Sequence, residues 1–436
     1  TGRYPSVHGL RYNGNYLPKD ATTFIDVLSK EGYKTSSIGK IHLQPMTDLP
    51  PHPWVDDSDL GPIKEAWSHS HKDYTVEQAK NFTSDKYFNI PKPYYGFDHV
   101  DLVTGHGDKC NGHYIQWLRN NHSDYENFFD PQNQIPHNYS CRQGYRTPIP
   151  EEFYPTAFVE KKSIEYFNSI SDSNNPFISF VSFPDPHHPF TPPGKYWDMY
   201  DPDDMPIPDT LNKGDSTMEV YLRDQLETGK AERNTQMPYA VSPREVQESM
   251  ALTFGMITMI DDQIGRILSS LKQLGLDENT VIMFTSDHGD YMGDHGLMLK
   301  GPLHLHGMIR VPFIWSDPDH RGAKNISSLA QTIDISATIL ERARIKPYWG
   351  MQGTSLNDVM QGRNLDNRNA VLIEDDRQRI NLGFTRFQKI RTLVTNQYRC
   401  TLGYPDARDE IYDLIADPGE LNNRSLDEPE LARQRA

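Results

Sequence analysis

The pattern of hydrophobic and polar positions alternates between two kinds of segment over the first 355 residues. Short apolar runs, which are typical of buried strands, occur at residues 33–38, 176–183, 281–284 and 311–315. Apolar residues at mixed three- and four-residue spacing predict helices at residues 22–31, 155–170, 243–274 and 333–343. Alternating helices and fully buried strands predict an α/β fold, with a mostly parallel central sheet covered by helices on both faces.

Two long regions lack this periodicity. Residues 44–154 are rich in His, Pro, Asn, Asp and Tyr, and we expect long loops there around a strand near 97–103. Residues 196–241 are interpreted as a second irregular insertion. Long ordered loops over an α/β sheet usually carry specificity.

The pattern changes near residue 370. Short strands separated by polar turns are predicted at residues 371–374, 382–384, 387–394, 398–402 and 410–414. We therefore expect an α/β catalytic domain at residues 1–355 and a small C-terminal antiparallel sheet subdomain at residues 365–436.

Charged and imidazole side chains follow the predicted strands. They are Lys40 and His42 after the first strand, His187 and His188 after the second, Asp287 and His288 after the third, and Lys300 ahead of the fourth. Because the carboxyl ends of parallel strands open into one crevice, we expect these side chains to meet there. Such a set of ligands and fixed charges is what a metal-dependent enzyme acting on an anion requires.

Five motifs connect these residues to a known family. They are TGRYP at 1–5, GKIHL at 39–43, PHHPF at 186–190, SDHG at 286–289 with a downstream lysine, and EIYDL at 410–414 followed by DPGE at 417–420. In this order they resemble the type I, formylglycine-dependent sulfatases of the alkaline phosphatase superfamily over essentially the whole chain. The resemblance implies hydrolysis of a sulfate ester, on a sulfated carbohydrate or an aryl sulfate.

The resemblance also implies roles for individual residues. Lys40 and Lys300 would hold the sulfate oxygens and His42 would assist the nucleophile. His187 would protonate the leaving oxygen, a role that suits an imidazole. Asp287 and His288 would bind a divalent metal, most consistent with Ca²⁺ and with Mn²⁺ or Mg²⁺ still open.

In the family, the nucleophile is a formylglycine made from a cysteine, or a serine, in a motif that TGR closes. We therefore expect the nucleophile, and an Asp pair that completes the metal site, upstream of Thr1. A formylglycine-generating or sulfatase-maturating enzyme is then an expected partner. Cys110, Cys141 and Cys400 do not lie in that motif, and a Cys110–Cys141 disulfide and free thiols are both compatible with the sequence.

Four further residues are candidates for substrate binding. His304 and His306 alternate along the segment after Lys300, and Asp376 and Arg377 end a predicted strand of the C-terminal subdomain. A structural role at the wall of the pocket, or in a solvated turn, fits the same positions.

Composition narrows the classes of partner. The 436 residues carry a formal net charge of -16, which argues against nucleic acid as a partner. No apolar run approaches the roughly 20 residues of a membrane span. An anionic sulfate ester then requires a local basic pocket inside an acidic surface. Family analogy places the protein in the periplasm or outside the cell.

Two alternatives to a sulfatase remain. A phosphonate monoester or phosphodiester hydrolase of the same superfamily would share the fold, the metal and SDHG, although the Lys and His of GKIHL favour a sulfatase. A catalytically inactive protein that binds sulfated glycans would share the pocket without the nucleophile.

Overall fold

The computed structural model describes residues 1–47, 74–231, 236–320, 322–363, 368–377, 382–404 and 409–425. Its main sheet has the strand order β3-β2-β1-β4. The strands are β1 (Lys34–Lys40), β2 (His99–Thr104), β3 (Asn111–Gly112) and β4 (Phe177–Ser182). β1 is parallel to both β2 and β4, whereas the short β3 is antiparallel to β2. The predicted parallel core of the sheet is thus confirmed.

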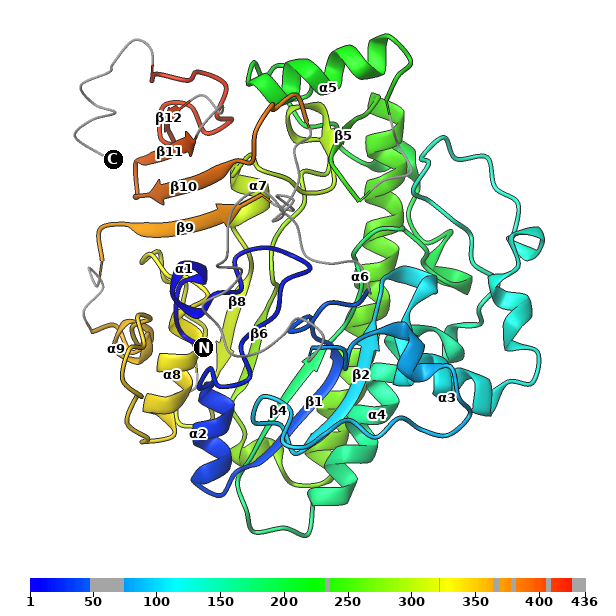
Figure 1. Cartoon of the computed structure of the whole chain (residues 1–436), viewed down its shortest axis with the longest axis vertical. Coiled ribbons are helices and arrows are strands. Elements are labelled where there is room, and N and C mark those ends of the chain that lie inside the picture. Colours follow the sequence, from blue (N-terminus) through cyan, green and yellow to red (C-terminus); the bar gives the residue numbers. More distant parts are fainter. Residues whose placement is uncertain are drawn as a thin grey trace, which may run out of the picture.

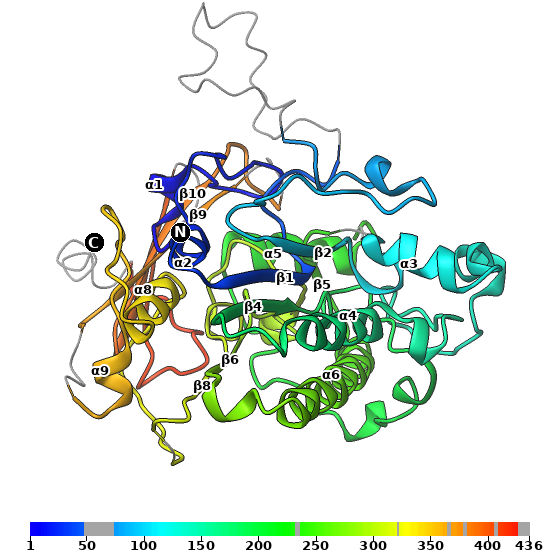
Figure 2. The ribbon, with the colours of Figure 1, turned by 90° about the horizontal axis from the view of Figure 1, so that it is seen from below.

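Helices cover this sheet as the periodicity predicted. The helices α4 (Pro155–Ile170) and α6 (Pro243–Gln273) pack on each other along one face, and α2 (Phe24–Lys30) lies on the opposite side of β1 (Figure 2). Ser242 caps the N-terminus of α6 and forms a capping box with Glu245. The helix begins here because these two side chains accept N–H groups that would otherwise lack a partner. Ile267 and Leu271 near its end belong to the same hydrophobic core as β1 and β2.

Two further strands lie between β4 and the C-terminal part of the chain (Figure 1). They are β6 (Ile282–Thr285) and β8 (Phe313–Ser316), which pair antiparallel as a two-stranded sheet. The prediction of a fully buried parallel strand at 281–284 is therefore wrong: Phe284 is 42% exposed and Ile314 is 58% exposed. The reason is that, in the described part of the chain, β6 pairs with β8 alone, and the sheet face with Phe284 and Ile314 is left open to solvent.

The C-terminal residues form a separate antiparallel sheet, as predicted (Figure 1). Its order is β12-β11-β10-β9. The strands are β9 (Val371–Asp376), β10 (Lys389–Val394), β11 (Tyr398–Tyr404) and β12 (Glu410–Asp413). The start of the chain lies against β9, because the Ser6 N–H and hydroxyl both bond to the Glu374 carboxylate. The domain boundary between residues 355 and 365 stays a prediction.

The remaining elements are short or lie in the connecting regions. They are α1 (Pro5–His8), α3 (His113–Asn121), α5 (Thr217–Glu227), α7 (His306–Ile309), α8 (Asp334–Arg342), α9 (Asn357–Met360), β5 (Tyr239–Ala240) and β7 (Leu297–Met298). Among the described residues, no helix has both the length and the apolar character needed to cross a membrane. Cys110, Cys141 and Cys400 are buried free thiols, which decides between the two cysteine alternatives.

Three local predictions were wrong. Both regions expected to be irregular contain a helix, α3 in the first and α5 in the second. The signal for α5 was present in the sequence, since Ser216 and Glu219 form a capping box at its start. The strand expected at 382–384 is a turn, because Leu382 and Gly383 have φ angles of 61° and 84°, which an extended strand cannot contain. Residues 48–73 of the first region lie outside the described residues.

Candidate active site

The carboxyl ends of β1 and β4 approach each other unusually closely. A Cβ atom placed on Gly39 would lie 1.8 Å from the Ser182 carbonyl oxygen, and Gly39 has φ 107°, so only glycine fits. Lys40 ends β1 directly after this contact, and His42 follows. The segment with His187 leaves β4 from the same point. The close approach therefore brings the lysine and the histidine loop side by side.

Three histidine rings stack where these strands end. The His187 centroid lies 3.6 Å from that of His106 and 4.1 Å from that of His188. The two outer rings are 6.4 Å apart, so His187 is the middle ring. The Nε2 atom of His188 is held at 3.1 Å by the Gln236 side-chain oxygen. Figure 1 shows the ends of β1, β2 and β4, which supply these segments, next to one another.

The predicted metal ligands follow β6. The His288 Nδ1 donates to the Gly289 carbonyl at 2.7 Å, which leaves Nε2 as the atom that can bind a metal. This Nε2 lies 3.4 Å from Asp287 Oδ2. The two atoms lie close enough together to be ligands of one hard cation.

The pair alone does not complete a metal site. Among the described residues no group of three or more His, Cys, Asp or Glu side chains converges on a point where a metal could bind. The residues present thus fit a hard cation as two ligands of a larger set.

The chain between Asp287 and Lys300 folds into a hairpin, which brings Lys300 back towards Asp287. The Tyr291 N–H donates to the Leu299 carbonyl at 2.8 Å, and β7 then leads into Lys300. Burial and, next, the ammonium of Lys40 together lower the pKa of Lys300 to about 8, although the carboxylate of Asp287 opposes the shift. Lys40 and Lys300 thus lie close enough to repel each other.

The imidazoles of this pocket are held neutral. Burial is the main cause, followed by the charges of Lys40 and Lys300, and together they lower the pKa of His42 to about 4 and that of His106 to about 2. The pKa of His188 falls to about 3 and that of His187 falls further still, in both cases through burial and then Lys300. At neutral pH the positive charge of this cluster therefore resides on Lys40 and Lys300, which makes it locally basic within an acidic chain.

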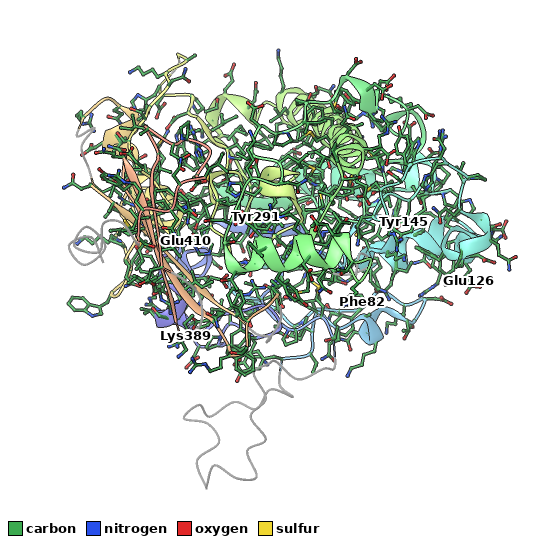
Figure 3. All side chains as sticks on the ribbon, turned by 90° about the horizontal axis from the view of Figure 1, so that it is seen from above. Phe82, Glu126, Tyr145, Tyr291, Lys389 and Glu410 are labelled. Atoms are coloured by element: carbon green, nitrogen blue, oxygen red, sulfur yellow. The ribbon has the colours of Figure 1, made fainter. Side chains whose placement is uncertain are left out.

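The C-terminal sheet holds the loop that carries these residues. The buried His295 bonds through Nδ1 to Glu219 of α5 and through Nε2 to the Gly419 carbonyl, the latter at 2.9 Å. Glu420 accepts the His306 N–H at 2.7 Å at the start of α7. The predicted DPGE motif therefore anchors the segment between Asp287 and α7. Tyr291 lies buried behind α5, with Glu410 in the neighbouring sheet (Figure 3).

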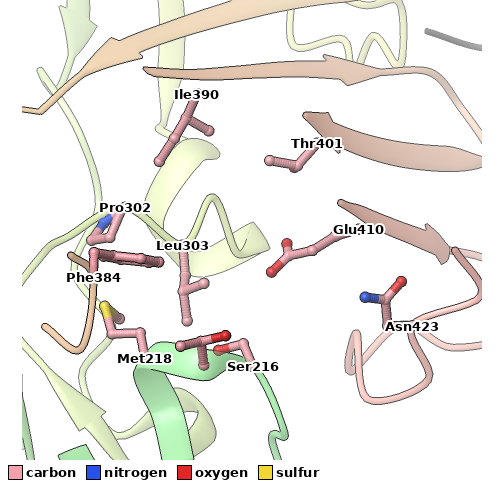
Figure 4. A pocket seen from close by; sticks show the side chains of 10 residues that line it. Ser216, Met218, Pro302, Leu303, Phe384, Ile390, Thr401, Glu410 and Asn423 are labelled. Carbon is pink, nitrogen blue, oxygen red and sulfur yellow. The ribbon is translucent and has the colours of Figure 1, made fainter. Parts of the chain in front are cut away.

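A small cavity lies in this seam (Figure 4). Its walls come from the start of α5, from Pro302 and Leu303, and from β10 to β12. The cavity is about 20 Å³, room for about one water molecule, so it is too small to accept a substrate.

The predicted residues divide into two groups. Lys40, His42, His187, Asp287, His288 and Lys300 lie near enough to one another for the charges of the two lysines to influence the other four. The four substrate-binding candidates lie instead at the seam with the C-terminal sheet. His304 is buried and bonds to Thr392 at 2.7 Å, and His306 Nε2 bonds to Arg310 at 3.1 Å.

The other two candidates lie at the end of β9. Asp376 pairs with Arg391 at 2.8 Å, and Arg377 lies 3.5 Å from Asp375. A substrate-binding role for these four residues stays a prediction.

The sequence reasoning missed His106. It follows β2 in Thr104-Gly105-His106-Gly107, an imidazole at a strand end flanked by glycines. The same criterion had selected Lys40 and His42, so the signal was available. Gln236, which holds His188, gives no such signal because it lies in an irregular segment.

Comparison with known proteins places this geometry in a family. A family model described as Sulfatase matches residues 101–345, and one described as N-sulphoglucosamine sulphohydrolase, C-terminal, matches residues 293–434. An arylsulfatase of Clostridium perfringens is 29% identical over 97% of this chain and 78% of its own length. An ulvan-active sulfatase of Formosa agariphila is 25% identical over 97% of this chain, which spans 65% of that relative.

Solved structures share the fold at lower identity. A phosphonate monoester hydrolase of Agrobacterium radiobacter has a TM-score of 0.73 and 21% identity, with 100% of this chain and 82% of that one covered. A structure solved in complex with its substrate D-glucosamine-2-N,6-O-disulfate has a TM-score of 0.66 and 19% identity, with 100% and 84% covered.

Proposed function

This chain belongs to the sulfatase family of the alkaline phosphatase superfamily, and we propose that it hydrolyses the sulfate ester of a sulfated carbohydrate or an aryl sulfate. The observation that carries the proposal is the convergence of Lys40 and Lys300 beside Asp287 and the stacked histidines. Two fixed ammonium groups suit the three peripheral oxygens of a sulfuryl group, which share the negative charge of the sulfate ester.

His187 is the proposed proton donor. When the S–O bond to the alcohol breaks, the leaving oxygen takes a proton, and an imidazole supplies one near neutral pH. Burial and then the charge of Lys300 lower the pKa of His187, and a bound anionic substrate opposes the second of these causes. His42, close to both lysines, is the base that we assign to the proton of the nucleophile.

Two groups from outside the described residues complete this proposal. A divalent cation, most consistent with Ca²⁺, would be held by Asp287 and His288 and would polarise the sulfate. A formylglycine made from a cysteine or serine upstream of Thr1 would supply the nucleophile, which makes a maturating enzyme a partner.

The open sheet edges support an upstream contribution. β4 and β6 are each at the edge of their sheets among the described residues, and Phe180 and Phe284 on them are 44% and 42% exposed. Unpaired strand edges with exposed aromatic residues are unusual next to an active site, since they expose N–H and C=O groups and apolar surface. A segment that also brings the Asp pair to the metal would cover them.

The class of substrate rests on the relatives. The relatives include an N-acetylglucosamine-6-O-sulfatase and an ulvan-active sulfatase. Because their names point to sulfated glycans, we propose a sulfated glycan as the natural substrate of this chain. Function in the periplasm or outside the cell would give the enzyme access to such a polymer.

A phosphonate monoester is the second candidate substrate, because the likeness to a phosphonate monoester hydrolase reaches a TM-score of 0.73. The GKIHL segment distinguishes the two candidates. Its Lys and His pair follows the sulfatase pattern and therefore favours the sulfate ester.

The test compares turnover of 4-nitrophenyl sulfate and 4-nitrophenyl phenylphosphonate by the complete, matured protein. We expect the sulfate to be the better substrate and Lys40→Ala to lower its turnover by about 10²- to 10³-fold, as for the loss of one stabilising donor. Lys30→Ala, at an exposed lysine of α2, is the control and should leave turnover unchanged. Faster turnover of the phosphonate would overturn the proposal.

A further inference from the structure

The His106 ring packs face to face with the proposed proton donor. The interplanar angle between His106 and His187 is 14° at a centroid distance of 3.6 Å, a closer and flatter contact than the 28° and 4.1 Å between His187 and His188. His187 is thus enclosed between two rings, and His106 makes the tighter of the two contacts.

The backbone holds His106 in this place. Gly105 and Gly107 on either side have φ angles of 78° and 52°, and a Cβ on Gly107 would lie 2.9 Å from the Pro189 carbonyl oxygen. The next N–H, that of Asp108, donates to Thr191 Oγ1 at 3.0 Å. The loop after β2 is therefore fixed to the loop that carries His187, and the stack joins two anchored segments.

The His187 ring has few other constraints. Its Nδ1 donates to the carbonyl of the neighbouring His188, which makes Nε2 the atom that exchanges the catalytic proton. No hydrogen bond to Nε2 is present within the described part of the chain, and none reaches either ring nitrogen of His106. The orientation of the ring plane is then set by the flanking rings rather than by a hydrogen bond to Nε2.

We propose that His106 is a positioning residue for His187, whose stacked ring keeps Nε2 of His187 directed at the leaving oxygen of the bound ester. The inference rests on the proposed function in that it assigns proton donation to His187. A neutral aromatic face also tolerates a protonated imidazole against it, because the ring quadrupole attracts a cation. His106 needs its ring for this role, and its nitrogens are dispensable.

The test uses His106→Phe, which keeps a flat ring, and His106→Ala, which removes it. Both are measured as kcat/KM in the complete, matured protein with aryl esters of graded leaving-phenol pKa. Because a misplacement of about 1 Å can cost about 10²-fold, we expect His106→Ala to lose about that factor with the poorest leaving group and little with the best. His106→Phe should stay within a few-fold of wild type throughout.

A second comparison tests whether His106 acts through His187. In a His187→Ala background, His106→Ala should cause no further loss, because the group that it positions is gone. Equal losses for all leaving groups, a His106→Phe variant as slow as His106→Ala, or an additional loss without His187 would each overturn the inference. His106→Phe keeps the test valid if His106→Ala does not fold.

Failure of the proposed function can be told apart from failure of this inference. If the wild type prefers phosphonate esters, the proposed substrate is wrong, but the leaving phenol still needs a proton. The same variants are then compared on a series of aryl phosphonates, with the same three outcomes decisive.

Discussion

Asp287 Oδ2 and His288 Nε2 lie 3.4 Å apart, with the other nitrogen of His288 bonded to a backbone carbonyl. A tautomer fixed in this way directs the free nitrogen of a histidine to a metal. The two atoms would thus be placed to bind one cation together, although they come from consecutive residues.

Removal of Asp287 should therefore remove the metal. Asp287→Ala deletes an anionic ligand from a site for a hard cation, so we expect loss of both bound metal and turnover with the fold retained. Elemental analysis measures the metal, and circular dichroism checks the fold. Asp277→Ala, at an exposed position before β6, is the control. Metal content equal to that of the wild type would reject the ligand assignment.

His187 and Lys300 should differ in how their loss depends on the leaving group. His187→Ala removes a proton donor, typically worth about 10²- to 10⁴-fold, and the loss should grow as the pKa of the leaving phenol rises. Lys300→Ala removes charge stabilisation at the sulfuryl group and should slow all substrates more evenly. The measurement is kcat/KM for a series of aryl sulfates under conditions where ester cleavage is rate-limiting.

If the loss of activity in His187→Ala does not grow with the pKa of the leaving phenol, the proton donor is a residue other than His187. His188, whose ring lies 4.1 Å from that of His187, is then the next candidate, and Lys300 the one after it.

Much of the site could be predicted because one rule applies repeatedly. Lys40, His187 and Asp287 each follow an apolar run, and the ends of neighbouring strands must meet whatever the loops do. The rule holds even though β6 pairs antiparallel with β8, since Asp287 after β6 still lies near Lys40 and Lys300. Long amphipathic helices such as α6 were predicted for a similar reason, because their periodicity extends over many turns.

What could not be predicted depends on tertiary contacts. The turn at Leu382 has an apolar sequence that favours a strand, but its buried side chain packs against α5 and the site loop with a left-handed backbone. The exposure of Phe284 depends on which segments flank β6, which the apolar run itself does not report. The stack of His106 on His187 joins residues 81 positions apart in the sequence, and no local pattern links them.

A buried carboxyl behind the GKIHL segment should make stability depend on pH. Glu77 accepts the N–H groups of Leu43 and Gln44 at 2.9 and 3.1 Å and the Tyr94 hydroxyl at 2.7 Å. Burial nevertheless raises its pKa from 4.5 to about 8. The folded state therefore binds this proton more tightly than the unfolded state, and the resulting stability, complete below pH 4.5, is lost as pH rises through about 8.

Glu77→Gln tests this sign, because the amide keeps an acceptor for the same N–H groups without titrating. Between pH 5 and 8 the free energy of unfolding of the wild type should fall relative to that of Glu77→Gln, by about 1.4 kcal/mol per pH unit at most. Urea unfolding at several pH values measures it. Parallel profiles for the two proteins would show that the carboxyl stays ionised in the fold.

The last prediction concerns the charge cluster that joins the C-terminal sheet to the site loop. Arg399, 1% exposed, pairs with Glu410 at 2.8 Å and with Glu420, which in turn accepts the N–H of His306. Arg399→Met would leave both carboxylates buried without their cation, which typically costs about 3–5 kcal/mol. We expect a lower urea midpoint of unfolding for Arg399→Met, with loosening of the loop that carries Lys300.

Arg424→Met is the matched control, because Arg424 pairs with Asp413 at 3.3 Å in the same subdomain but its side chain is 34% exposed. Because solvent still reaches Arg424, removal of its charge should shift the urea midpoint less than the Arg399→Met change does. If both arginine variants shift the midpoint equally, the buried cluster has no special weight. If only Arg399→Met shifts the midpoint, the buried ion pairs of Arg399 stabilise the fold, and Glu420 of the DPGE motif connects them to the site loop through the N–H of His306.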